Sequence, residues 1–185
     1  MAAAERTVSA PLAQLPNALT VARLALIPIF IVLMVQAGDN SSWPAGVVFG
    51  IAAITDQVDG FLARRWHVES RFGQLADPLA DRLMIDAAVI FLAVYDRLPW
   101  VGLAVIIGRD VLLLAGSVLL APRGIDVEVN TVGKAATWVL YASIFFRIVI
   151  DPATKWPLYL FWAGLALALV AAVFYIVTAR RELQR

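Results

Sequence analysis

Four aspartates at the margins of two apolar segments are the residues of this chain best suited to chemistry. Asp56 and Asp59 lie three positions apart, and Asp77 and Asp81 lie four apart. Because these spacings fall on one face of a helix, each segment would present two carboxylates in the same direction. A carboxylate at the centre of a membrane helix costs roughly 2.5–3.5 kcal/mol, so four of them need compensating charge. A pair of Mg²⁺ or Mn²⁺ ions would balance the four negative charges.

The residues between the two aspartate pairs favour a phosphate-bearing ligand. Hard divalent cations take oxygen ligands, and two of them can clamp a diphosphate. Gly60 and Ala63 are small and clear space along the carboxylate face, and Arg64 continues that face and can hold phosphate bidentately. Taken singly, these residues are typical of a helix cap, a helix-packing face and a membrane anchor. Their combination indicates a site.

The composition predicts an integral membrane protein. The chain has 185 residues, of which 62% are apolar, and its mean hydropathy is +0.82. That length holds about six spans of about 20 residues with short loops. We expect a tail at 1–14 and a single all-α domain of six transmembrane helices at 15–185. Cysteine is absent, which excludes disulfides and thiolate chemistry. We expect no nucleic-acid partner.

The predicted spans place the aspartates at one face of the membrane. The expected ranges are 15–36, 44–64, 78–96, 99–120, 133–150 and 156–179. Ten lysines and arginines fall on one side, whereas the other side carries Arg97, Arg147 and Lys155. The positive-inside rule therefore predicts a multi-pass protein of the cytoplasmic membrane with both termini and the active site facing the cytoplasm. The alternative, a cleaved signal peptide ending at 35–37, fits less well because Arg23 interrupts its core.

The motif resembles the signature of a known enzyme family. The pattern D-x-x-D-G-x-x-A-R, then eight residues, then G-x-x-x-D-x-x-x-D is filled at every position, by Asp56, Asp59, Gly60, Ala63, Arg64, Gly73, Asp77 and Asp81. It is similar to the signature of the CDP-alcohol phosphotransferases. The resemblance implies a six-helix membrane enzyme, usually a homodimer, that depends on Mg²⁺ or Mn²⁺. It would transfer a phosphatidyl group from CDP-diacylglycerol to an alcohol acceptor and release CMP.

The resemblance also implies roles for individual residues. The four aspartates would hold two metal ions, and Asp81 would also act as general base. The CDP pocket would be lined by Asp59, Gly60, Ala63, Arg64 and Gly73, with Thr55 as a further member. Gly73 is expected in the linker between two helices, where a bend or a close approach favours glycine.

Matches outside the motif leave the acceptor open between glycerol-3-phosphate and phosphatidylglycerol, giving phosphatidylglycerophosphate or cardiolipin. The runs beginning at Pro16 and at Gly108 resemble the phosphatidylglycerophosphate and cardiolipin synthase branch, as does the Gly-Lys-x-x-Thr run at 133–137. Arg23, Arg109 and Lys134 are candidates for binding an acceptor phosphate. Arg109 lies within an apolar span, where the alternative is an ion pair with Asp86 or Asp110.

Two other classes of function remain to be weighed. A divalent-cation carrier could use the same aspartates, but transport needs access from both sides, and the opposite halves of these spans carry few polar groups. A non-catalytic membrane scaffold would tolerate neutralisation of Asp77 or Asp81. The row of small residues formed by Gly164, Ala168 and Ala172 predicts a helix-packing surface, either inside the chain or between two copies.

Overall fold

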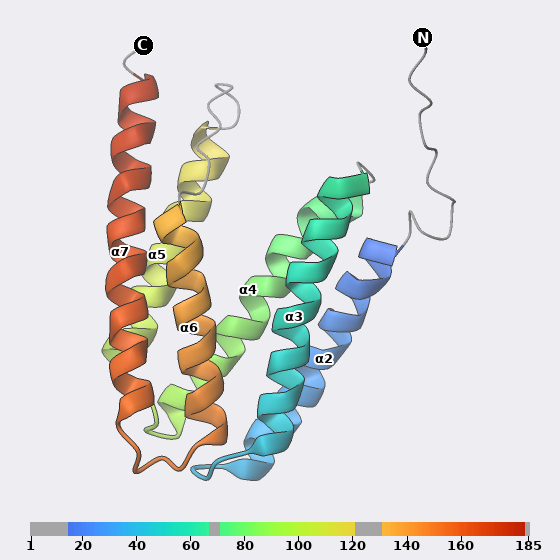
Figure 1. Ribbon diagram of the computed structural model, residues 1–185, viewed down its shortest axis with the longest axis vertical. Helices are drawn as coiled ribbons and strands as arrows, with labels where there is room; N and C mark the ends of the chain where they lie inside the picture. Colours follow the sequence, from blue (N-terminus) through green and yellow to red (C-terminus); the bar gives the residue numbers. More distant parts are fainter. Residues whose placement is uncertain (1–14, 67–70, 121–130, 184–185) are drawn as a thin grey trace.

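A computed structural model describes the backbone at residues 15–66, 71–120 and 131–183, and the side chains at 21–55, 83–112, 115 and 131–178. The described backbone is helical and contains no strand. Its helices run antiparallel in sequence order (Figure 1). They are α2 (Leu15–Ala37), α3 (Trp43–Trp66), α4 (Arg71–Val94), α5 (Trp100–Leu120), α6 (Thr131–Val149) and α7 (Trp156–Leu183). The all-helical prediction is confirmed, while the tail at 1–14 lies outside the described residues.

One predicted boundary is wrong. The third segment was expected to start at Pro78, but α4 starts at Arg71. Gly73 therefore lies in the first turn of a helix, not in a linker. The intervening residues, Gln74, Leu75 and Ala76, are strong helix formers, which offsets a cost of about 1 kcal/mol for one glycine. Proline inside a helix is tolerated in membrane segments, where neighbouring helices satisfy the freed carbonyl.

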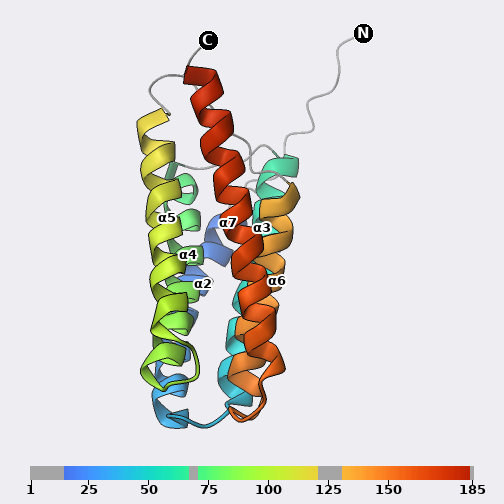
Figure 2. The same ribbon diagram turned by 90° about the vertical axis from the view of Figure 1, so that its left-hand side faces the viewer.

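The helices pack as two groups that meet in a common core. Helix α2 packs against α3 and α4, α6 packs along α7, and α3 contacts α6 (Figures 1 and 2). Fully buried side chains fill the centre, including Phe30, Phe49, Leu92, Ile144 and Phe161. Helix α2 packs into this core through the buried side chains of Phe30 and Met34.

The small-residue row on α7 packs inside the chain. Gly164, Ala168 and Ala172 are all buried. A Cβ added at Gly164 would lie 3.1 Å from the backbone nitrogen of Leu140 on α6. The row thus lets two helix backbones approach closely, as small residues do in membrane bundles.

Two of the described helices are long and apolar enough to cross a membrane, at Thr131–Val149 and Trp156–Thr178. Large apolar side chains on α7 point outward, among them Val173 and Phe174, which are 59% and 52% exposed. Shorter apolar stretches lie at Val21–Ala37, Trp43–Thr55 and Leu83–Val94. The chain is therefore an apolar helical bundle with surfaces suited to lipid.

The described links between helices, at 38–42, 95–99 and 150–155, lie at the end of the bundle opposite the aspartate motif (Figure 1). Gly38, with φ of 59°, ends α2 in the left-handed region that glycine adopts without strain. Ser42 caps α3, since its hydroxyl accepts the Ala45 N–H at 3.2 Å. Asp96, with φ of 53°, ends α4, and the Arg97 N–H then reaches back to the Leu92 carbonyl at 2.7 Å. These caps fix the end of the bundle that carries the described links, which is called the link end below.

Candidate active site

The two aspartate pairs lie on neighbouring antiparallel helices at matching depths. Helices α3 and α4 are in contact, and at most about 19 Å of chain joins Trp66 to Arg71. At a rise of 1.5 Å per residue, Asp59 lies about 10 Å and Asp56 about 15 Å from the end of α3. By the same measure, Asp77 lies about 9 Å and Asp81 about 15 Å from the start of α4. The hairpin therefore brings Asp56 and Asp81 to one level of the bundle, and Asp59 and Asp77 to a second level nearer the helix ends.

The third helix at this end carries a buried cation. Helix α2 starts at the motif end and packs against both α3 and α4. Its Arg23 is 1% exposed and lies about 12 Å from the start of α2. The structure thus places Arg23 at the depth of the aspartates, on a helix that touches both of their helices.

Thr55 precedes the first aspartate, and its hydroxyl is engaged within the helix. Its Oγ1 donates to the Ile51 carbonyl at 2.7 Å. Because that bond uses the single hydroxyl proton, Thr55 can offer a ligand only its oxygen as an acceptor. Its part in the CDP pocket stays a prediction.

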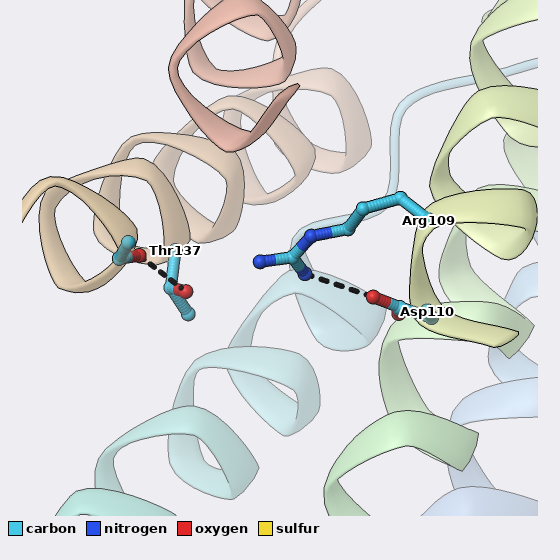
Figure 3. Close-up of polar contacts among 4 residues, drawn as sticks. Arg109, Asp110 and Thr137 are labelled. Carbon is cyan, nitrogen blue, oxygen red and sulfur yellow. Dashed lines mark hydrogen bonds and ion pairs between the residues drawn. The ribbon is translucent and has the colours of Figure 1, made fainter. Parts of the chain in front are cut away.

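A second polar feature, Arg109, lies in a narrow pocket between α4, α5, α6 and α7. The pocket has a volume of about 40 Å³, and its polar lining includes Arg109, Asp110, Thr137 and Tyr141. Figure 3 shows the Arg109 guanidinium crossing from α5 toward Thr137 on α6. The remaining walls are apolar, with Ile85, Ile106 and Leu165 among them. An arginine in such surroundings favours an anionic ligand or a fixed counter-charge.

The counter-charge is present. Arg109 Nη1 lies 2.8 Å from Asp110 Oδ1, and both side chains are largely buried at 19% and 15% exposure. The ion pair with Asp110 that was weighed from the sequence is therefore confirmed. One pair does not use all the donors of a guanidinium, which has five N–H groups. Arg109 Nε has no hydrogen-bond partner among the described residues, so the pair leaves donors available to a ligand.

One of the three candidates for the acceptor pocket lines this pocket between the described side chains. Arg109 lines the pocket, whereas Arg23 and Lys134 do not appear in its wall. Lys134 is exposed, near the start of α6. Thr137 lies one turn further along α6, and its hydroxyl donates to the Gly133 carbonyl at 3.0 Å. Of these two residues of α6, Thr137 therefore lines the pocket and Lys134 does not.

Sequence reasoning missed Tyr141. It is 8% exposed and lines the pocket with Thr137, four positions earlier on the same helix face. The available signal was two hydroxyl side chains at that spacing within an otherwise apolar span. Thr137 was noticed only as the last residue of the Gly-Lys-x-x-Thr run.

The donor set at the motif end fits divalent cations. Four carboxylates at two matched levels supply oxygen ligands and enough charge for two hard ions, whose remaining positions would be taken by water or phosphate. Elsewhere in the part of the chain with described side chains, no group of three or more His, Cys, Asp or Glu could hold a metal. The side chains of Asp56, Asp59, Asp77 and Asp81 lie outside the described residues, and their role as metal ligands stays a prediction.

Comparison with known proteins places the chain in a family. Residues 13–177 match the family model described as CDP-alcohol phosphatidyltransferase. A CDP-diacylglycerol–glycerol-3-phosphate 3-phosphatidyltransferase of Bacillus subtilis is 35% identical, over 91% of this chain and 92% of that protein. The enzyme of the same name from Escherichia coli K12 is 32% identical, over 91% of this chain and 96% of that protein. The chain therefore belongs to the CDP-alcohol phosphatidyltransferase family and is a phosphatidyl-transferring enzyme of phospholipid biosynthesis.

Proposed function

We propose that this enzyme transfers the phosphatidyl group of CDP-diacylglycerol to glycerol-3-phosphate, forming phosphatidylglycerophosphate and releasing CMP. The observation that carries the proposal is the matched depth of the two aspartate pairs on the α3–α4 hairpin. The names of the bacterial relatives support the choice of glycerol-3-phosphate over phosphatidylglycerol. A divalent-cation carrier is not favoured, because the family match covers nearly the whole chain.

Asp56, Asp59, Asp77 and Asp81 would hold two divalent ions. Bound there, Mg²⁺ or Mn²⁺ would neutralise the donor diphosphate and stabilise the charge that develops on the leaving oxygen. Asp81 would accept the proton of the acceptor hydroxyl as that oxygen bonds to the phosphorus of the phosphatidyl group. The bond from this phosphorus to the CMP oxygen then breaks. A carboxylate among cations is a weak base, but it needs to accept the proton only as the hydroxyl attacks.

The donor would lie along the small residues of the same hairpin. Gly60 and Ala63 follow Asp56 by four and seven positions, which keeps them on the carboxylate face of α3. Arg64 continues that face toward the helix end and would pair with the CDP phosphates. Gly73, in the first turn of α4, would let the nucleotide approach the backbone closely.

The acceptor phosphate would be bound by Arg109, with help from Arg23 and Lys134. Arg109 lies about 14 Å from the start of α5, whereas Asp56 and Asp81 lie about 20 Å from the link end of their helices. Its side chain crosses from α5 toward α6 (Figure 3) and would bind the acceptor phosphate on the side nearer the aspartates. A phosphorylated acceptor needs such a cation.

The bundle would cross the cytoplasmic membrane with all six helices. An even number of crossings puts both termini on one side, and the distribution of lysine and arginine makes that side the cytoplasm. The donor's acyl chains would then enter from the surrounding lipid, while glycerol-3-phosphate enters from the cytoplasm. The working unit would be a homodimer, as the family resemblance implies.

CMP release by purified enzyme tests the proposal. With CDP-diacylglycerol and Mg²⁺, we expect turnover with glycerol-3-phosphate and none with phosphatidylglycerol or inositol phosphate. Asp81→Asn should retain donor binding and lose nearly all turnover, because the base is removed while the charge change is small. Near-normal turnover of this variant would refute the role of Asp81. Release with phosphatidylglycerol alone would overturn the acceptor and keep the reaction class.

A further inference from the structure

The three cations that the sequence places opposite the motif come together at the link end. Arg97, in the link between α4 and α5, and Arg147, in the last turn of α6, are 2% and 5% exposed. Together with the exposed Lys155, before α7, they line a cavity of about 200 Å³. Since one water occupies about 30 Å³ of liquid, this space holds several waters or a group of similar bulk.

The two arginines are held by backbone carbonyls. Because a carbonyl has no net charge, these contacts leave the positive charge of each guanidinium in place. Each guanidinium donates to the other's main-chain carbonyl. Arg97 also donates to the Asn40 carbonyl at 2.8 Å and the Ile150 carbonyl at 3.0 Å. Arg147 donates to the Thr154 carbonyl at 3.2 Å. These bonds fix both cations rigidly at the cavity, where side-chain entropy has already been lost.

Donors remain unused at both arginines. The Nε atoms of Arg97 and Arg147 are buried and have no hydrogen-bond partner among the described residues. A buried guanidinium with an unsatisfied donor carries a free-energy cost that an anion in the cavity would relieve. Burial and the neighbouring Arg147 lower the pKa of Arg97 to about 10, so it stays charged at neutral pH.

Helix dipoles add to the positive potential of the cavity. Helix α5 starts at Trp100 and α7 at Trp156, and residues of both N-terminal ends line the cavity. Neither first turn contains an acidic residue, although acidic residues commonly compensate a helix N-terminus. Asp96 is the single carboxylate in the cavity wall, and its side chain is exposed. Asp39 and Asp151 lie outside that wall, close enough to Arg97 to raise its pKa against the larger effect of burial.

The surroundings of the cavity are those of a lipid headgroup layer. Trp43, Trp100 and Trp156 are all exposed at the starts of their helices on this end. Exposed Val101 and Tyr159 follow directly along α5 and α7. Tryptophan and tyrosine concentrate where lipid headgroups meet the hydrocarbon, with apolar residues below them. In the proposed membrane arrangement, an occupant of the cavity would lie at the depth of lipid phosphates.

We propose that Arg97, Arg147 and Lys155 form a binding site for the phosphate of an anionic phospholipid, in the leaflet opposite the catalytic aspartates. Inorganic phosphate shares the recognised chemistry, but the tryptophan rim favours a lipid. The occupant bridges the links before α5 and α7 and so stabilises the link end of the bundle. The site is separate from the active site, so it neither requires nor tests the proposed reaction.

Lipid binding by delipidated full-length protein in detergent tests this site. Native mass spectrometry would count and titrate bound phosphatidylglycerol, with phosphatidylcholine and inorganic phosphate in parallel. Lys155→Gln should weaken phosphatidylglycerol binding about fivefold, the effect of one lysine near a charged lipid surface. Asp96→Asn should tighten it, because the opposing charge is lost. Lys155 is exposed, so its substitution leaves the buried arginines in place.

Ser41→Asp is the matched control. It changes the net charge by the same amount at the same end, on an exposed residue outside the cavity wall, and should leave binding unchanged. Equal weakening by Ser41→Asp and Lys155→Gln would mean general surface electrostatics and would overturn the site. So would equal retention of phosphatidylcholine and phosphatidylglycerol. Displacement of phosphatidylglycerol by an equal concentration of inorganic phosphate would overturn the lipid as occupant.

Discussion

Replacing Arg109 by glutamine separates a structural ion pair from an acceptor-binding residue. The structure gives Arg109 one bond to Asp110, at 2.8 Å, and leaves its other terminal nitrogen facing the space beside Thr137 (Figure 3). A charge-assisted hydrogen bond contributes about 1.5–3 kcal/mol. Loss of one such bond to the acceptor phosphate corresponds to a fall in kcat/KM for glycerol-3-phosphate of roughly 10- to 150-fold. The KM for CDP-diacylglycerol should stay within about twofold.

The double variant Arg109→Gln/Asp110→Asn decides between the two roles. If the arginine only neutralises Asp110, the double variant should be as active as the single variant Asp110→Asn. The reason is that no partly buried carboxylate is then left unpaired. If the arginine binds the acceptor, the double variant should keep the raised KM of Arg109→Gln. Steady-state CMP release, with acceptor and donor varied in turn, makes the measurement. Recovery of kcat/KM in the double variant would refute the acceptor role.

Two further predictions concern the metal site and the packing. Asp56→Asn should shift the Mg²⁺ titration of activity to higher concentration as well as lower the rate, and an unchanged titration would count against its role as a ligand. Gly46→Ala should destabilise the bundle by about 1–3 kcal/mol through overpacking, because the added Cβ would lie 2.1 Å from Val149 Cγ1. Thermal unfolding should show Val149→Ala rescuing that loss, and additive destabilisation would contradict the proposed clash.

The helices were predictable from sequence because long runs of apolar residues identify membrane segments. The predicted start of 156–179 coincides with that of α7, and 15–36 differs from α2 by one residue. The boundary at Pro78 failed because proline was read as a start signal, although α4 already runs from Arg71. Helix starts marked by proline carry this ambiguity in membranes, where a bundle tolerates proline inside a helix.

The candidate site divides into a local part and a part that depends on packing. The aspartate pairs follow from spacing on two consecutive helices, which is local information. The Arg109 pocket combines residues from four helices. Spacing could have linked Tyr141 to Thr137 on one face of α6, but not to Arg109 on another helix. The ion pair to Asp110 was foreseen as one of two partners, but adjacent positions on a helix do not face each other, so the choice between Asp86 and Asp110 depended on packing.

The two ends of the bundle show opposite solutions to burying charge. At the link end, Arg97 and Arg147 lie against carbonyl oxygens, and these contacts within the chain hold that end before a bound lipid adds to its stability. At the motif end, four carboxylates share two neighbouring helices, and like charges at such positions repel. Arg23 is buried on the helix that packs against both, and in the proposed site bound cations would offset the remaining repulsion, so the motif end would gain stability from the ions that the reaction needs. A helical enzyme of this size can therefore keep its catalytic end responsive to metal and substrate because its other end is fixed by its own backbone.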